Sequence, residues 1–246
     1  MRICVSLRFK ELKTLPFNHL FELMSASLNK IGEADPELAY KYHEKPKYKP
    51  YNLSWLNIDI AKTSKKGLIP NSNEATYLFN SPNQRLINSF VEGFLANPDL
   101  VLKKNEEKVV FELDSIEAIK EPSFDDEMSF ETITPVAVRT QEKENGKVKT
   151  VDLRPNSKKF YDNLFQNLIN RYQNYHQQKP NINTQNIDLK ILNSKPKRLK
   201  IRNTWQMATQ MKFKTKADEK LNKFMYYTGL GERNNQGFGC IEVIKD

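Results

Sequence analysis

The sequence predicts an α+β protein in which one order of elements, βαββαβ, occurs twice. Apolar residues alternate strictly over residues 2–9, as in a half-buried strand. Apolar residues then recur at helical spacing after the first strand of each half, and the whole pattern starts again after Glu121-Pro122-Ser123. Two such units in tandem correspond to ferredoxin-like (RRM-like) domains, which we expect over residues 1–122 and 123–246.

The first half begins with the strand over residues 2–9. A helix is expected next over residues 18–32, with Asn18 as its N-cap and Gly32 at its end. The remaining elements of this half are expected as strands over residues 51–60, 75–81 and 108–119, and a helix over residues 82–98.

The second half repeats the order with one addition. Residues 130–141 and 147–153 flank Asn145-Gly146, and Asn-Gly between two strand-like segments predicts a β-hairpin. The other elements are expected as helices over residues 157–172 and 217–229, and strands over residues 186–201, 205–215 and 237–246.

Composition excludes several classes of protein. Hydrophobic residues make up 38% of the 246 residues, which is enough for a core and argues against a disordered chain. No apolar run approaches the roughly 18 residues of a membrane helix, and the N-terminus lacks a signal-peptide apolar region. Cys4 and Cys240 form no disulfide framework, so a cytoplasmic location is expected. His19, His43 and His176 lie far apart in the sequence, and we expect neither a metal nor a cofactor.

The positive charge is concentrated in the second half. The net charge is +9, of which residues 1–123 carry +1 and residues 124–246 carry +8. The richest stretch, between Lys190 and Lys223, favours a polyanionic partner such as nucleic acid. Within it, the segment SKPKRLKIR is either an edge strand protected from aggregation by lysine or a phosphate track beside Trp205.

Four of the eight glycines lie in the segment GLGERNNQGFGCIEV, residues 229–243. The segment is not a Walker A loop, and it is not a dinucleotide fingerprint because no helix follows the glycines. Two interpretations remain open. The glycines end a helix and shape a bulge, or they let another chain approach the backbone closely while Arg233 and Asn234 contact phosphate.

His43 is the histidine with the strongest functional context. It lies in the polar, lysine-rich segment AYKYHEKPKYKPY, where it is either exposed and inert or placed to transfer protons near neutral pH. His19 is expected to pack in the first turn of a helix. His176 is expected to be exposed at the end of a helix, where a cation is favourable.

Five segments occur in one order along the chain: LPFNHLFELM, YHEKPKYKPYNLSWL, FETITPVAVR, SKPKRLKIR and the glycine-rich C-terminal loop. In this order they resemble the CRISPR repeat-processing endoribonucleases, the sixth Cas family of the RAMP superfamily. The resemblance implies two ferredoxin-like domains and an enzyme that cuts CRISPR precursor RNA within the repeat without a metal.

The resemblance also implies site residues. A histidine in the turn and a lysine about six residues later correspond to His43 and Lys49, and we add the neighbouring Tyr42 as a catalytic candidate. Some members carry a tyrosine in the first helix, where this sequence has Leu28. The expected RNA-binding residues are Lys45, Lys47, Lys197, Arg198, Lys200, Arg202, Gly229, Gly231, Arg233 and Asn234.

The reaction that the resemblance implies is attack of a ribose 2′-OH on the adjacent phosphate, leaving a 2′,3′-cyclic phosphate and a 5′-OH. The partner is then CRISPR repeat RNA, with a monomer or homodimer as the expected state and no membrane involved. The alternative is a non-catalytic RNA-binding subunit of the same fold, bound to other Cas proteins in an effector complex.

Overall fold

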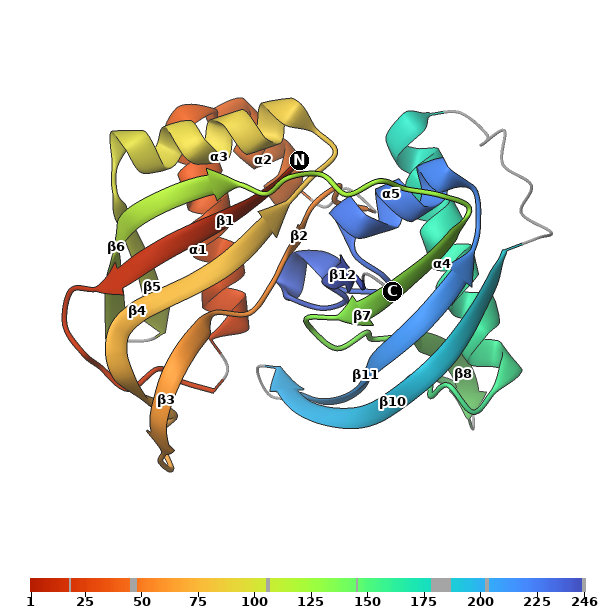
Figure 1. Ribbon diagram of the computed structural model, residues 1–246. Coiled ribbons are helices and arrows are strands. Elements are labelled where there is room, and N and C mark those ends of the chain that lie inside the picture. Colours follow the sequence, from red (N-terminus) through yellow and green to blue (C-terminus); the bar gives the residue numbers. More distant parts are fainter. Residues whose placement is uncertain are drawn as a thin grey trace. The chain divides into compact units, whose positions relative to one another are not determined.

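The structure is a computed structural model that describes residues 1–17, 19–44, 48–104, 107–144, 146–177, 187–201 and 204–244, with the backbone alone at Lys104 and Lys200. The chain forms two compact units, Met1–Glu121 and Pro122–Asp246 (Figure 1). Each unit has its own sheet, its own helices and its own hydrophobic core.

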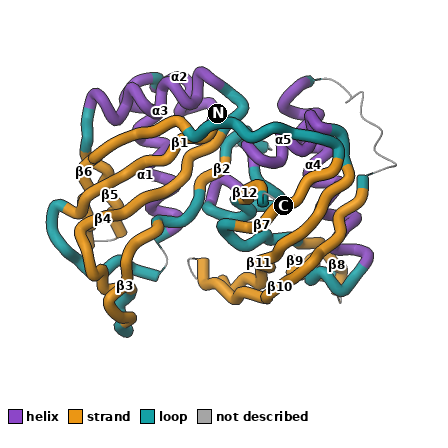
Figure 2. Tube along the Cα trace, in the orientation of Figure 1, coloured by secondary structure: helices purple, strands orange, loops and turns teal. Residues whose placement is uncertain are grey.

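Unit 1 is an antiparallel sheet with its helices packed on one face (Figures 1 and 2). The strands follow the order β2-β4-β1-β6-β5, with β3 also paired to β4. The elements are β1 (Arg2–Phe9), α1 (Leu20–Ala34), α2 (Pro36–His43), β2 (Asn52–Leu53), β3 (Asn57–Thr63), β4 (Leu68–Asn80), α3 (Gln84–Ala96), β5 (Asp99–Lys104) and β6 (Glu107–Ala118).

This order confirms the ferredoxin-like fold of the first half, because β1 lies in the middle between β4 and β6. Three details differ from the prediction. The expected strand over residues 51–60 is divided into β2 and β3, α2 is an additional helix, and β5 is an additional strand at the edge of the sheet.

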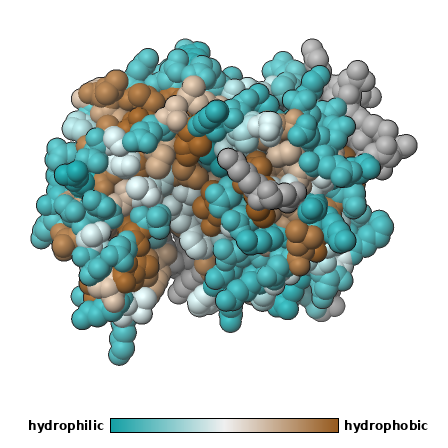
Figure 3. All heavy atoms as spheres, in the orientation of Figure 1, coloured by the Kyte–Doolittle hydropathy of each residue, from teal (hydrophilic) through white to brown (hydrophobic). Residues whose placement is uncertain are grey.

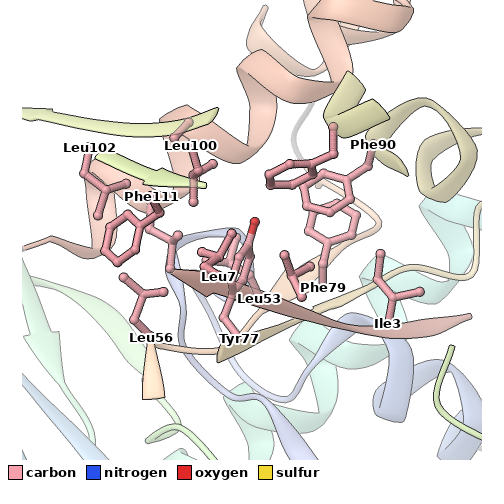
Figure 4. Packing of buried hydrophobic residues seen from close by; sticks show 14 of the residues in the cluster. Ile3, Leu7, Leu53, Leu56, Tyr77, Phe79, Phe90, Leu100, Leu102 and Phe111 are labelled. Atoms are coloured by element: carbon pink, nitrogen blue, oxygen red, sulfur yellow. The ribbon is translucent and has the colours of Figure 1, made fainter. Parts of the chain in front are cut away.

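Stacked aromatic rings hold the helices of unit 1 on its sheet (Figure 4). Phe79 of β4 and Phe90 of α3 are both fully buried, and their rings are parallel with centroids 4.2 Å apart. Tyr51, just before β2, stacks on Phe79 at 5.6 Å. Truncating one such buried phenylalanine costs about 3–5 kcal/mol, so these contacts fix where β2 and the segment before it lie.

Unit 2 repeats the topology, with strand order β10-β11-β7-β12 in an antiparallel sheet. A separate hairpin of β8 and β9 turns at Gly146, as predicted (Figure 2). The elements are β7 (Glu127–Thr132), β8 (Arg139–Glu144), β9 (Lys147–Asp152), α4 (Lys158–His176), β10 (Asp188–Ile201), β11 (Thr204–Lys216), α5 (Glu219–Thr228) and β12 (Ile241–Val243).

The last strand of unit 2 is shorter than predicted. Residues 237–246 were expected as one strand, but β12 covers only Ile241–Val243. A turn of 3-10 helix at Asn234–Gln236 and a positive φ at Gly237 and Gly239 occupy the preceding segment. The glycine-rich segment is therefore mostly loop.

Hydrophilic residues cover most of the face shown in Figure 3, and the hydrophobic ones lie in separate patches. Within the described part of the chain, no helix has the length and apolar character required to cross a membrane.

Candidate functional site

Helix α2 carries His43 at its end, and its start is fixed by a charged cap. The Asp35 carboxylate accepts a hydrogen bond from the Leu38 backbone N–H at 3.0 Å, and Pro36 occupies the first turn. The Arg85 guanidinium on α3 donates to the same carboxylate at 2.7 Å. These contacts anchor α2 to α3 even though the helix has only eight residues.

His43 is the last residue of α2 and its side chain is exposed. A turn was predicted at this position. The difference arises because Leu38 and Tyr42, four residues apart on one face of α2, are both buried in the unit 1 core. His43 comes next in the sequence and faces away from that core.

Lys49 lies on the other side of the lysine-rich segment and is half-buried. Burial lowers the pKa of its ammonium below the ordinary value of 10.5. The backbone directly after it is held in place, since the Ser81 hydroxyl donates to the Pro50 carbonyl at 2.6 Å and Tyr51 is 1% exposed.

One aromatic contact joins the two ends of this segment. The rings of Tyr42 and Tyr51 meet edge to face, with centroids 6.2 Å apart. His43 follows the first ring and Lys49 precedes the second by two residues, so both residues lie within two positions of this ring contact. Lys45 and Lys47, predicted to bind RNA, lie outside the described residues.

Tyr42 itself is placed as a core residue. It is 5% exposed, its hydroxyl accepts from the Asn83 side-chain amide at 3.4 Å, and burial raises the pKa of its hydroxyl. The Tyr42 ring therefore belongs to the core, and its catalytic role stays a prediction.

The other two histidines lie at the ends of other helices. His19 is 7% exposed directly before α1, and His176 is exposed at the end of α4 beside the ring of Tyr172, at 4.3 Å. Over the residues that the structure describes, no three His, Cys, Asp or Glu side chains form a group that could hold a metal ion.

In unit 2, a cationic side chain of the basic strand β10 lies over an aromatic ring. Arg198 is exposed and its guanidinium carbon lies 4.6 Å from the centroid of Trp205, which is itself exposed on β11. Lys197 is half-buried. Lys200 lies on the backbone opposite Trp205 but its side chain is not described, and Arg202 lies outside the described residues.

The backbone of the glycine-rich loop lies close to other backbone atoms of unit 2. A Cβ at Gly239 would lie 1.9 Å from the Leu230 carbonyl oxygen, and one at Gly231 would lie 2.5 Å from the Ala137 carbonyl oxygen. Both glycines also have positive φ, as does Gly229 at the end of α5. Asn234 is buried and its amide donates to the Leu230 and Phe238 carbonyls, both at 3.1 Å. The glycines and Asn234 therefore hold the fold of this loop.

Arg233 is one of the side chains of the loop that remain partly accessible, with Glu232, Asn235 and Gln236. Its guanidinium donates to the Gln236 side-chain oxygen at 3.3 Å, and also to Gln206 at 2.6 Å when the oxygen of that amide faces it. Burial, with the nearby Arg139 as a smaller cause, lowers the pKa of Arg233. The Arg139–Glu232 ion pair beside it, at 2.6 Å, ties the loop to β8.

Comparison with known proteins identifies the family. The sequence matches the models for CRISPR-associated protein Cas6, N-terminal, over residues 14–113 and CRISPR associated protein Cas6, C-terminal, over residues 119–243. It is 32% identical over 247 residues to CRISPR-associated endoribonuclease Cas6 1 of Methanocaldococcus jannaschii, covering all of this chain and 94% of the relative. The chain belongs to the Cas6 family.

Solved structures agree with Cas6 membership. One described as CRISPR associated protein Cas6 has a TM-score of 0.82 at 32% identity, covering 100% of this chain and 99% of that one. One described as an RAMP protein binding different RNA substrates has a TM-score of 0.86 at 29% identity, with 100% of both chains covered. These matches confirm the predicted family, tandem fold and endoribonuclease class.

A further relative of the Cas6 chain carries a different name. It is the putative CRISPR-associated endoribonuclease-like protein Cas6nc of Pyrococcus horikoshii, 28% identical over 250 residues with all of both chains covered.

Sequence reasoning missed residues that position the candidate site residues. Arg171 is buried on α4 and donates to the carbonyls of Thr228 at 2.9 Å and Gly229 at 2.6 Å, which fixes the end of α5 and the start of the glycine-rich loop. The sequence did carry a signal for its burial, because Arg171 lies on the same face of α4 as the buried residues Leu164 and Leu168. Asp35 followed by Pro36 is a local helix-start signal that was not used, whereas Tyr51 gave no comparable signal because its aromatic partners are distant in the sequence.

Proposed function

We propose that this protein cleaves CRISPR precursor RNA within the repeat, with His43 and Lys49 as the residues that act on the scissile phosphate. The observation that carries the proposal is the contact between Tyr42 and Tyr51, since His43 and Lys49 lie within two positions of it. An exposed imidazole and a partly desolvated ammonium are the groups that proton transfer and phosphate stabilisation require.

The proposed reaction uses the RNA as its own nucleophile. A base removes the proton of the ribose 2′-OH, the oxygen attacks the adjacent phosphorus, and the 5′-oxygen leaves after it is protonated. His43 takes the first proton or delivers the second. The Lys49 ammonium stabilises the negative charge that grows on the non-bridging oxygens. The products are a 2′,3′-cyclic phosphate and a 5′-OH.

RNA binding is proposed for the basic half of the chain. Support comes from Arg198 stacked on exposed Trp205 and from the net charge of +8 over residues 124–246. The assignment of catalysis to residues 1–122 and RNA binding to residues 123–246 is part of this proposal.

The alternative is that this protein, with the same fold, binds repeat RNA without cutting it. Support for this alternative comes from the Pyrococcus horikoshii relative, which is named endoribonuclease-like. Incubating the protein with repeat RNA from its own genome in excess EDTA separates the two. Cleavage to a cyclic phosphate and a 5′-OH supports the proposal, whereas intact RNA in a stable complex supports the alternative.

Replacing Lys49 with alanine is expected to slow the chemical step more than it weakens RNA binding. The reason is that Lys49 meets charge that is larger in the transition state than in the bound RNA. Single-turnover rates at saturating protein and a binding isotherm measure the two effects separately. A large loss of affinity with an unchanged saturated rate would make Lys49 an ordinary phosphate contact.

Replacing Arg198 and Lys200 together with alanine is expected to weaken RNA binding and flatten its salt dependence. Each lost phosphate contact removes about 0.7 from the slope of log K against log salt for single strands, so both together remove about 1.4. Lys197, which is half-buried, is expected to matter less. Affinities at several salt concentrations measure the slope, with Lys158→Ala on α4, a side chain that is 88% exposed, as the control. Equal slopes for the wild type and the double variant would exclude this face of β10 as an RNA track.

A further inference from the structure

Unit 1 contains a pocket of about 420 Å³ that the proposed reaction does not use. It lies where the start of α1 meets the β5–β6 hairpin and the β3–β4 turn, and neither His43 nor Lys49 lines it. Its volume falls within the range of small-molecule sites. The lining residues are Lys13, Thr14, Pro16, His19, Glu22, Lys66, Leu102, Glu107, Lys108 and Val109.

The walls of the pocket are fixed by the backbone. Leu15 and Leu68 exchange two backbone hydrogen bonds, each 2.8 Å long, which hold the segment before α1 against the β3–β4 hairpin. A Cβ at Gly67 would lie 2.1 Å from the Leu15 carbonyl oxygen, so only glycine permits this contact. Lys66 is thereby held at the rim of the pocket.

His19 presents a hydrogen-bond acceptor to the pocket. Its Nδ1 lies 2.8 Å from the Pro16 carbonyl oxygen, and because a carbonyl only accepts, Nδ1 carries the proton. Burial lowers the pKa of His19 below 6.5, so the ring is neutral at pH 7. Nε2 therefore keeps its lone pair. It is buried and has no hydrogen-bond partner among the described residues.

Glu22 presents a second acceptor on the same face of the helix start. It follows His19 by three residues, and its Oε2 atom is likewise buried without a partner in the described ranges. Leaving a buried polar atom unpaired costs about 1–3 kcal/mol, and two such acceptors on residues that line one pocket suit a ligand with two donors.

The rim of the pocket has the opposite character. Lys13, Lys66 and Lys108 are exposed there, against the single exposed carboxylate of Glu107. Lys13 also pairs with Glu11 at 2.7 Å, so Lys66 and Lys108 are the rim cations with no ion pair in the described part of unit 1. The pocket thus combines acceptors at depth with cations at its mouth, which suits a ligand with donors at one end and an anion at the other.

We propose that this pocket binds an unpaired guanosine 5′-phosphate, with the guanine edge on His19 Nε2 and Glu22 Oε2 and the phosphate at Lys66 and Lys108. Guanine places two donors, N1–H and N2–H₂, side by side. Adenine and cytosine place a donor beside an acceptor, and uracil flanks its one donor with carbonyls. The same chemistry can come from a free nucleotide or from an unpaired guanosine in RNA, and the second source rests on the proposed function.

Calorimetric titration with mononucleotides tests the site on the full chain. GMP is expected to bind at least tenfold more tightly than IMP, which lacks the N2 amino group, and more tightly again than UMP. Glu22→Gln replaces an acceptor with a donor and is expected to lower GMP affinity at least tenfold. Glu92→Gln, which changes an exposed carboxylate on α3, is the matched control.

Lys66→Ala tests the phosphate contact. It is expected to reduce the preference for GMP over guanosine, and it changes an exposed side chain that the fold does not depend on.

Anisotropy with the RNA heptamers AAAGAAA and AAAAAAA distinguishes the two sources. A guanosine preference that Glu22→Gln abolishes in the RNA as well as in GMP identifies an RNA subsite, and a preference confined to GMP identifies a free-nucleotide site. Equal binding by the wild type and Glu22→Gln in both experiments overturns the proposal. The GMP titration requires no RNA cleavage, so its failure and a failure of the proposed enzyme activity are observed independently.

Discussion

Replacing His43 with alanine is expected to slow cleavage of repeat RNA by about 10²–10⁴-fold while leaving RNA affinity nearly unchanged. The side chain is exposed at the end of α2, so its removal leaves the unit 1 core intact. Proton transfer in the transition state is lost, whereas contacts that bind the RNA in the ground state remain. Single-turnover cleavage rates together with a binding isotherm measure both quantities.

His176→Ala is the matched control for this experiment. His176 is also an exposed histidine in the last turn of a helix, on α4 of unit 2, and it has no role in the proposed reaction. It is expected to cleave at the wild-type rate. A His43→Ala variant that cuts within tenfold of the wild type would show that His43 is not the proton-transfer group.

Replacing Gly239 with alanine is expected to destabilise unit 2 by about 2–5 kcal/mol. Positive φ costs a residue with a Cβ about 1–2 kcal/mol, and overpacking adds about 1–3 kcal/mol because the new methyl group would meet the Leu230 carbonyl oxygen at 1.9 Å. That oxygen cannot move freely, since the Leu230 N–H donates to the Gly239 carbonyl at 2.9 Å. Chemical denaturation followed by circular dichroism measures the loss.

Gly146→Ala separates the two causes of this loss. Gly146 has a similar positive φ of 76°, but a Cβ there has no neighbouring atom within 4 Å. It is expected to lose only the conformational part, about 1–2 kcal/mol. Equal losses for the two variants would mean that the close approach at Gly239 contributes nothing to stability.

The order of the main strands and helices could be predicted because each carries a strong local signal. The alternation in β1 and the helical spacing in α3 and α4 survive in the structure with small changes at their ends. The Asn-Gly pair in the sequence likewise predicted the β8–β9 hairpin.

Elements that depend on tertiary contacts could not be predicted. Helix α2 buries only Leu38 and Tyr42, and its cap is completed by Arg85 from a helix fifty residues away in the sequence. Strand β5 is six residues long and is defined by pairing with β6, directly after the end of a helix. The Asp35-Pro36 start is the one local signal of α2, and β5 has no local pattern that distinguishes it from a loop.

For the candidate site, the sequence identified residue types but not their surroundings. Glycine enrichment indicated a close backbone approach, and the structure shows that the approaching atoms belong to Leu230 and Ala137 of the same unit. The pairing of His43 with Lys49 came from family resemblance. The proximity of their two anchoring rings is a tertiary contact that no spacing reveals.

The contact between Tyr42 and Tyr51 has an evolutionary consequence. The chain leaves the core at Tyr42 and returns at Tyr51, so an exposed position such as Glu44 can change without altering the packing of the two rings. Mutation can therefore vary the exposed surface beside His43 while the inherited scaffold of the two rings stays unaltered.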